Sequence, residues 1–192
     1  AGIGVIPEGV ILSGSNAKVG DKVILSGSVG EHGIAILSQR EGINFRTFLE
    51  SDCAPLNKLV AEILGVSQEI HVLRDPTRGG IATTLNEIAQ QSRVGITIEE
   101  IRIPIRDEVR AVCELLGFDP IYVANEGKLI AIVAAKDAEK VLAKMRKNKL
   151  GSQAAIIGEV IADYPGKVIM KTSLGSTRII SMTTGELLPR IC

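Results

Sequence analysis

Residues 20–33 read GDKVILSGSVGEHG, and this stretch sets the architecture that we expect for the chain. A short β-rich run, Lys22–Ser26, leads into a glycine-punctuated loop and then into a helix start at Ile34–Arg40. A strand that meets a helix through glycines can bring backbone N–H groups up to an anion. Tight turns alone would explain the same glycines, and the sequence is neither a P-loop nor a dinucleotide fingerprint.

Strands and helices alternate on both sides of this stretch. Further strands are expected at 4–7, 69–73, 94–98, 121–124, 128–134, 155–160, 168–171 and 177–181. Further helices are expected at 57–64 before Gly65, from Gly79–Gly80 to 91, at 107–116 before Gly117, and from the N-cap Asp137 to 147. Adjacent strands within 121–134 and 155–181 suit hairpins. We therefore expect an α+β fold with a mixed sheet covered by helices.

Composition excludes several classes of protein. Hydrophobic residues make up 45% of the 192 residues but aromatic ones only 3%, so the core must consist of aliphatic side chains. Lysine plus arginine and aspartate plus glutamate each total 22, which gives neither a nucleic-acid nor a membrane-surface footprint. No apolar run has the length of a membrane span or the form of a signal peptide, so we expect a cytoplasmic protein.

A second glycine stretch, RDPTRGG at residues 74–80, again joins a strand to a helix. Asp75 and Thr77 could simply cap that helix. Alternatively, Asp75, Thr77 and Arg78 could lie at the rim of the sheet beside a phosphate-bearing ligand, because a guanidinium group meets phosphate oxygens in pairs. The residues alone leave both interpretations open.

A third stretch, VANEGKL at residues 123–129, places a carboxylate between two expected strands. Glu126 could act as a general base if partial burial raised its pKa. The alternative is a solvated hairpin turn built on Asn125 and Gly127.

The three cysteines differ in their surroundings. Cys53 and Cys113 lie among apolar or helical residues, where we expect them to be small buried hydrophobes. An odd count without close spacing argues against a disulfide framework or a zinc site. Cys192 ends the sequence GELLPRIC, and on a flexible tail its thiol could travel between sites; an accidental terminal cysteine is the alternative.

Taken in order, these stretches resemble the HypE family of hydrogenase maturation proteins, within the AIR synthetase (PurM-like) superfamily of ATP-dependent enzymes. The resemblance runs from residue 1 to residue 192 and includes SDC at 51–53, VCELLGFD at 112–119 and the terminal PRIC. It implies the end of an N-terminal domain and a linker at 1–16, a PurM C-terminal-domain-like unit at 17–181, and a mobile tail at 182–192.

The resemblance also implies a reaction. A carbamoyltransferase, HypF, would load a carbamoyl group onto Cys192, and ATP would phosphorylate the amide oxygen. Loss of phosphate would leave a protein thiocyanate, whose cyano group passes to iron on a HypC–HypD scaffold for the NiFe hydrogenase centre. The alternatives are another ATP-dependent synthase or kinase of the superfamily, or a partner-binding domain without chemistry.

The family pattern implies roles for individual residues. Cys192 and Glu126 would be catalytic, and no residue would bind a metal. Residues facing the cofactor would be Gly27, Gly30, His32, Gly33, Asp75, Thr77, Arg78, Gly79 and Gly80. Family members are much longer, so we expect this chain to lack the half that supplies most ATP and magnesium contacts and the surface of a homodimer.

Overall fold

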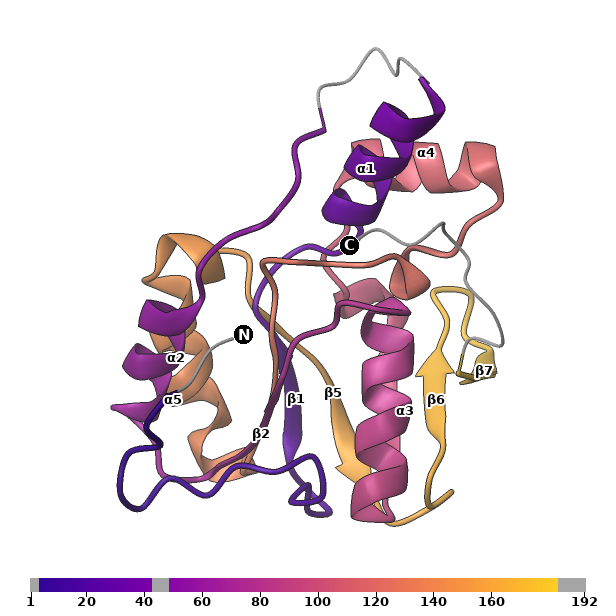
Figure 1. The fold of residues 1–192 in the computed structure, drawn as a ribbon. Helices are drawn as coiled ribbons and strands as arrows, with labels where there is room; N and C mark the ends of the chain where they lie inside the picture. Colours follow the sequence, from indigo (N-terminus) through magenta and orange to yellow (C-terminus); the bar gives the residue numbers. More distant parts are fainter. Residues whose placement is uncertain (1–3, 43–48, 183–192) are drawn as a thin grey trace.

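A seven-stranded sheet forms the centre of the protein (Figure 1). The computed structural model describes residues 4–42 and 49–182, in which the strand order is β2-β4-β1-β5-β3-β6-β7. The β3–β6 pair is parallel and the other five pairs are antiparallel, which confirms the expected mixed sheet. The strands are β1 (Lys22–Leu25), β2 (Ile70–Arg74), β3 (Gly95–Glu99), β4 (Ile130–Val133), β5 (Ala155–Ile161), β6 (Val168–Lys171) and β7 (Thr177–Ile180).

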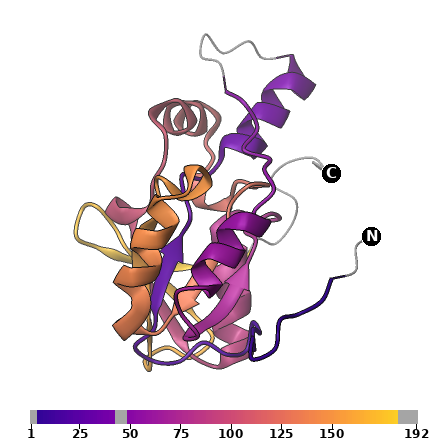
Figure 2. The same cartoon turned by 90° about the vertical axis from the view of Figure 1, so that its left-hand side faces the viewer.

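The helices are arranged unevenly around this sheet. Helix α3 packs on one face, whereas α2 and α5 lie side by side over the β2-β4-β1 half of the other face (Figures 1 and 2). Helices α1 and α4 lie together beyond one end of the strands. The helices are α1 (Glu31–Glu41), α2 (Asn57–Leu64), α3 (Gly80–Ser92), α4 (Asp107–Leu116) and α5 (Ala135–Arg146). Short 3₁₀ turns occur at Glu100–Arg102, Pro120–Tyr122 and Lys149–Gly151.

The alternation of side chains along β4 separates two aliphatic cores. Ile130 and Ile132 belong to the cluster under α3, whereas Ala131 and Val133 belong to the cluster under α2 and α5. Successive residues of a strand point to opposite faces, so a run that is apolar throughout fits a strand covered on both sides. All four side chains are fully buried.

Most of the expected elements are confirmed, and the bounds of α2, α4 and β6 agree with the prediction. Two expected strands are wrong. Residues 121–124 begin in a 3₁₀ turn, where Pro120 follows Asp119 and the Asp119 carboxylate accepts a hydrogen bond from the Ile121 N–H at 3.2 Å. Residues 4–7 pair with no strand of the described chain.

The expected hairpins are correct only for β6–β7. Strand β4 pairs with β1 and β2, so it forms no hairpin with the residues before it. Strand β5 pairs with β1 and β3 rather than with β6. Because the hydrophobic pattern fixes which residues form strands but not which strands pair, these long-range neighbours were hidden in the sequence.

Helix boundaries required two corrections. Helix α1 begins at Glu31 because Gly30, with φ of 92°, ends the preceding loop in a left-handed conformation. The N-cap of α5 is Ala134 and not Asp137, whose carboxylate accepts a hydrogen bond from the Ser67 hydroxyl at 2.5 Å. The domain boundaries after residue 16 and before residue 182 stay predictions, and residues 183–192 lie outside the described chain.

Candidate functional site

Three of the four stretches singled out in the sequence meet at one end of the sheet. Leu25, at the end of β1, and Arg74, at the end of β2, both pair with Ile130 at the start of β4. The loops that follow β1 and β2 and the loop that precedes β4 therefore emerge at the same end of the strands. This end lies on the side of α1 and α4 (Figure 1).

Asn125 joins these three loops through its side chain. Its Oδ1 accepts a hydrogen bond from the Gly30 N–H at 2.8 Å, and its Nδ2 donates to the Pro76 carbonyl at 3.0 Å. A third bond, also 3.0 Å, runs from Nδ2 to the Val123 carbonyl. The side chain is fully buried, so the solvated-turn interpretation of this stretch is wrong.

Both carboxylate oxygens of Asp52 bind the segment Glu126–Lys128. Oδ1 accepts a hydrogen bond from the Glu126 N–H at 3.0 Å, and Oδ2 accepts one from the Lys128 ammonium at 2.8 Å. Gly127 lies so close to the backbone of Asp52 that an added Cβ would be 1.7 Å from the Asp52 carbonyl oxygen. Glu126 is half-buried and precedes β4, but it does not lie between two strands as expected.

The glycine loop before α1 is packed into the protein. The Gly33 N–H donates to the Ala124 carbonyl at 3.1 Å, and the Gly30 N–H is occupied by Asn125. Gly27, Gly30 and Gly33 are all buried, and the Val29 N–H donates to the Pro104 carbonyl at 3.1 Å. Contact between this loop and phosphate stays a prediction.

Two neighbouring side chains at the start of α1 carry buried polar atoms without a partner in the described chain, Glu31 Oε2 and His32 Nε2. The other oxygen of Glu31 accepts a hydrogen bond from the Ser28 hydroxyl, and His32 Nδ1 lies 2.8 Å from Ser51 Oγ. A buried polar atom without a partner is costly. This pair therefore marks the place where a ligand or another part of the protein would be expected to contribute hydrogen bonds.

The RDPTRGG loop presents polar side chains at the rim of the sheet. Asp75 and Arg78 are exposed, and the Thr77 hydroxyl donates to the Asp75 carboxylate at 2.9 Å. The N-cap of α3 is Gly79 and no side chain caps the helix, so the helix-capping interpretation of Asp75 and Thr77 is wrong. Gly80 adopts φ of 61° against the backbone of residues 121–123.

Open hollows lie beside the RDPTRGG loop and beside the loops that carry Gly27 and Gly127. One, of about 340 Å³, is lined by Arg74, Asp75, Thr77, Arg78, Thr84 and Glu87. Another, of about 330 Å³, lies beside the Asp52–Lys128 pair and reaches Glu31, Arg106 and Lys149. Both hollows adjoin predicted site residues.

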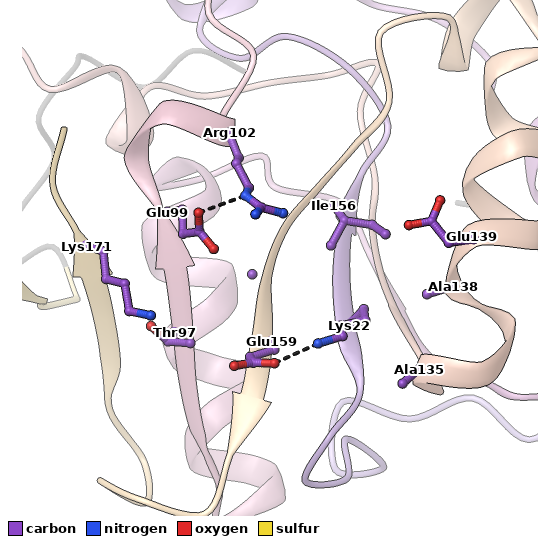
Figure 3. A pocket seen from close by; sticks show the side chains of 11 residues that line it. Lys22, Thr97, Glu99, Arg102, Ala135, Ala138, Glu139, Ile156, Glu159 and Lys171 are labelled. Carbon is purple, nitrogen blue, oxygen red and sulfur yellow. Dashed lines mark hydrogen bonds and ion pairs between the residues drawn. The ribbon is translucent and has the colours of Figure 1, made fainter.

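A further hollow of about 250 Å³ lies on the half of the sheet face that α2 and α5 leave uncovered (Figure 3). Four of its charged residues form two ion pairs: Lys22 pairs with Glu159 at 2.7 Å, and Arg102 pairs with Glu99 at 2.7 Å. None of the predicted site residues within the described part of the chain lines it. We interpret it as a solvated sheet face.

The cysteines differ from the expectation at one position. Cys113 is buried as expected, and burial, followed by the nearby Asp119 and Glu114 carboxylates, raises the pKa of its thiol to about 11. Cys53 is exposed, so its assignment to the core is wrong; it follows Asp52 in the connection to α2 rather than a packed element. Cys192 lies outside the described residues.

Neither a metal cluster nor a membrane helix is found in residues 4–42 and 49–182. No three His, Cys, Asp or Glu side chains gather closely enough to hold an ion. No helix there has the length and apolar character needed to cross a bilayer.

Sequence reasoning missed the residues that assemble the site. The sequence places Asp52 in the family stretch SDC, and Lys128 in VANEGKL and in the expected strand 128–134, without assigning either a role in the site. Asn125 was considered as a turn residue, although it is the buried side chain that joins three loops. No local pattern could reveal these contacts, because the partners are between 49 and 95 positions apart in the chain.

Comparisons with known proteins agree with this fold. The model of the family "AIR synthase related protein, C-terminal domain" matches residues 18–171. A carbamoyl dehydratase HypE of Cupriavidus necator is 54% identical over 191 residues, which cover 100% of this chain and 54% of the relative. The chain thus spans about half the length of the curated relatives it matches.

Two solved structures show the same fold. HypE in complex with ATP has a TM-score of 0.88 at 50% identity and is matched over 94% of this chain and 55% of that one. HypE in a HypE–HypF complex has a TM-score of 0.86 at 43% identity, over 90% of this chain and 56% of that one. The resemblance to the HypE family is confirmed, and the chain belongs to the family of C-terminal domains of AIR synthase related proteins.

Proposed function

We propose that the protein containing this chain is an ATP-dependent carbamoyl dehydratase of NiFe hydrogenase maturation. The observation that carries the proposal is the identity of 54% along the whole chain with a relative named carbamoyl dehydratase HypE. The interlocked loops around Glu126 support it, because they hold the loop of a half-buried glutamate in place, and Gly127 and Lys128 of the same loop line an open hollow. The same identity disfavours another kinase or synthase of the superfamily and a domain without chemistry.

The reaction assigns work to two residues of this chain. The sulfur of Cys192 would carry a carbamoyl group, –S–C(=O)–NH₂, whose oxygen is a poor leaving group until it is phosphorylated. When phosphate departs with that oxygen, the nitrogen must lose its protons as the C≡N bond forms. Glu126 is the proposed base for this proton transfer, and the surrounding hydrogen bonds would keep its loop in place.

The proposed cofactor contacts fit the polar groups present. ATP would supply the phosphoryl group that activates the amide oxygen. His32 Nε2 is buried without a partner in the described chain and could donate to a phosphate oxygen, while Arg78 is exposed at the rim. We assign magnesium mainly to the part of the relatives that this chain does not cover.

The proposed partners follow from the same relatives. One solved relative is a HypE–HypF complex, which supports a carbamoyltransferase as the protein that loads Cys192. A HypC–HypD scaffold would accept the cyano group, and the intact protein would be a cytoplasmic homodimer.

Replacement of Glu126 by glutamine in the intact protein tests the proposal. We expect S-carbamoylation by the carbamoyltransferase to continue, and ATP-dependent loss of water to slow by roughly 10²–10⁴-fold, the usual effect of removing a general base. Intact mass spectrometry separates the two steps. The matched control is Glu139→Gln, an exposed carboxylate on α5. Thiocyanate formation by Glu126→Gln at the normal rate would remove Glu126 from this role.

A further inference from the structure

Residues 49–56 lead into α2 (Figure 1), and Asp52 within them contacts the loop that carries Glu126. Within them, Asp52 uses each carboxylate oxygen for a different partner in that loop, the Glu126 N–H at 3.0 Å and the Lys128 ammonium at 2.8 Å. The carboxylate thus spans the residue before and the residue after Gly127.

The Asp52–Lys128 pair is strongly shielded from water. The exposed fraction is 4% for the Asp52 side chain and 12% for that of Lys128. Such a pair resists separation, because a buried charge left without its partner is costly. The backbone also fits closely: only glycine can occupy position 127, where a Cβ would clash with the Asp52 carbonyl oxygen.

Asp52 is itself held in place by its neighbour in the chain. Ser51 Oγ lies 2.8 Å from His32 Nδ1 and also accepts a hydrogen bond from the Cys53 N–H at 3.1 Å. The first contact connects Ser51 to the start of α1, and the second links Ser51 to Cys53, on either side of Asp52. The carboxylate therefore belongs to a fixed part of the structure rather than to a loosely attached loop.

We propose that Asp52 is a positioning residue for the dehydration step, which fixes the backbone of Glu126 and so the direction in which its carboxylate points. The inference rests on the proposed role of Glu126 as base. A misplacement of about 1 Å can cost on the order of 10²-fold in rate, so a residue that only anchors the base has a measurable effect. Two contributions must be separated: the anchor on the Glu126 N–H and the ion pair with Lys128.

Two double variants of the intact protein separate these contributions. Lys128→Met removes the ammonium in both. Asp52→Asn then keeps an oxygen that can accept from the Glu126 N–H, whereas Asp52→Ala removes it. We expect Asp52→Asn/Lys128→Met to dehydrate the S-carbamoylated protein within about 5-fold of the unmodified rate, and Asp52→Ala/Lys128→Met to be roughly 10²-fold slower at saturating ATP. The ATP concentration that gives half the maximal rate should stay within about 2-fold in both.

Amide hydrogen exchange provides a readout that does not depend on activity. The Glu126 amide should exchange faster in Asp52→Ala/Lys128→Met than in Asp52→Asn/Lys128→Met, because only the former lacks an acceptor. Glu159→Gln, which breaks the more exposed ion pair with Lys22, is the control and should change neither exchange nor dehydration. Equal dehydration rates and equal exchange in the two double variants would overturn the positioning role.

The outcomes distinguish this inference from the proposed function. If Glu126→Gln dehydrates normally, the proposed base fails, even where exchange at Glu126 depends on Asp52. If Glu126→Gln is inactive but the two double variants behave alike, only the positioning role of Asp52 fails. Slow S-carbamoylation of both double variants would show a general defect and would also overturn the inference.

Discussion

The side-chain oxygen of Asn125 accepts a hydrogen bond from the backbone N–H of Gly30, a residue 95 positions earlier in the chain. The amide nitrogen of the same side chain donates to the Pro76 carbonyl. One buried amide thus determines how the loop after β1, the loop after β2 and the loop before β4 fit together.

Asn125→Ala should destabilise the fold. The change leaves the Gly30 N–H and the Pro76 carbonyl buried without this partner, and an unpaired buried polar group costs about 1–3 kcal/mol. We expect the free energy of unfolding of the 192-residue chain to fall by roughly 2–4 kcal/mol in urea denaturation. Asn16→Ala is the control, since the Asn16 side chain makes an exposed 3.4 Å bond to Ile11 and should matter by less than about 0.5 kcal/mol. Equal losses would contradict the assigned role.

Gly80→Ala should be more harmful than Gly117→Ala, although both glycines have positive φ, 61° and 72°. At Gly117 an added Cβ meets nothing within 4 Å, so only the backbone strain of about 1–2 kcal/mol applies. At Gly80 the Cβ would be 2.4 Å from the Ile121 carbonyl oxygen, which adds an overpacking cost of about 1–3 kcal/mol. Thermal and urea unfolding of the two variants measure the difference. Similar stability of both would show that the close approach at Gly80 is unimportant.

The stability of the chain should fall as pH rises from about 9 to about 11. Burial raises the pKa of the Cys113 thiol from 9.0 to about 11, and Asp119 and Glu114 act in the same direction. In this window the unfolded chain has lost the thiol proton that the folded chain still binds, so the free energy of unfolding decreases with pH. Below pH 9 the thiol is protonated in both states and contributes no slope.

Cys113→Ala isolates this effect from other titrating groups. Urea denaturation of both proteins at about pH 8 and about pH 10.5 should show a smaller loss of stability for the variant. Identical losses would mean that the Cys113 thiol does not titrate differently in the folded and unfolded chains.

Cys192→Ala in the intact protein should abolish acceptance of the carbamoyl group. Only a thiol adduct can become a thiocyanate, and Cys113 is buried. Cys53 is an exposed thiol, so Cys53→Ser is a necessary control and should keep the full adduct. Peptide mapping by mass spectrometry decides the matter, and a carbamoyl group on Cys53 or on Cys192→Ala protein would refute the assignment.

Local signals in the sequence predicted most elements of the fold. Helix α4 could be bounded because Asp107 and Glu108 occupy its first turn and Gly117 ends it in a left-handed conformation. The short apolar run Val23–Leu25 likewise predicted strand β1, in which all three side chains are buried. The stretch 121–124 misled because its apolar side chains are buried without a strand partner, in a 3₁₀ turn and the loop that follows it.

The site was predictable in its parts and not in its assembly. The sequence pointed to the three loops and to Glu126, since glycines and a lone carboxylate between apolar runs are visible locally. The bonds of Asn125 and Asp52 join residues 49 to 95 positions apart, so only the tertiary structure could identify them. Cys53 is exposed because residues 49–56 form neither a helix nor a strand, and such a segment has no hydrophobic periodicity from which burial could be predicted.

The interior position of β1 in the sheet also bears on the order in which the protein can fold during synthesis. Lys22 pairs with Val133 on one side and with Glu159 on the other. Strand β1 is therefore synthesised well before β4 and β5, the two strands with which it pairs. Contacts of such long sequence separation slow folding, because the loop entropy must be overcome before they form. A nascent chain that ends before β5 would leave one edge of β1 without its hydrogen-bonding partner and open to association with other chains. Truncations intended to isolate a smaller active unit should therefore keep residue 161, the last residue of β5.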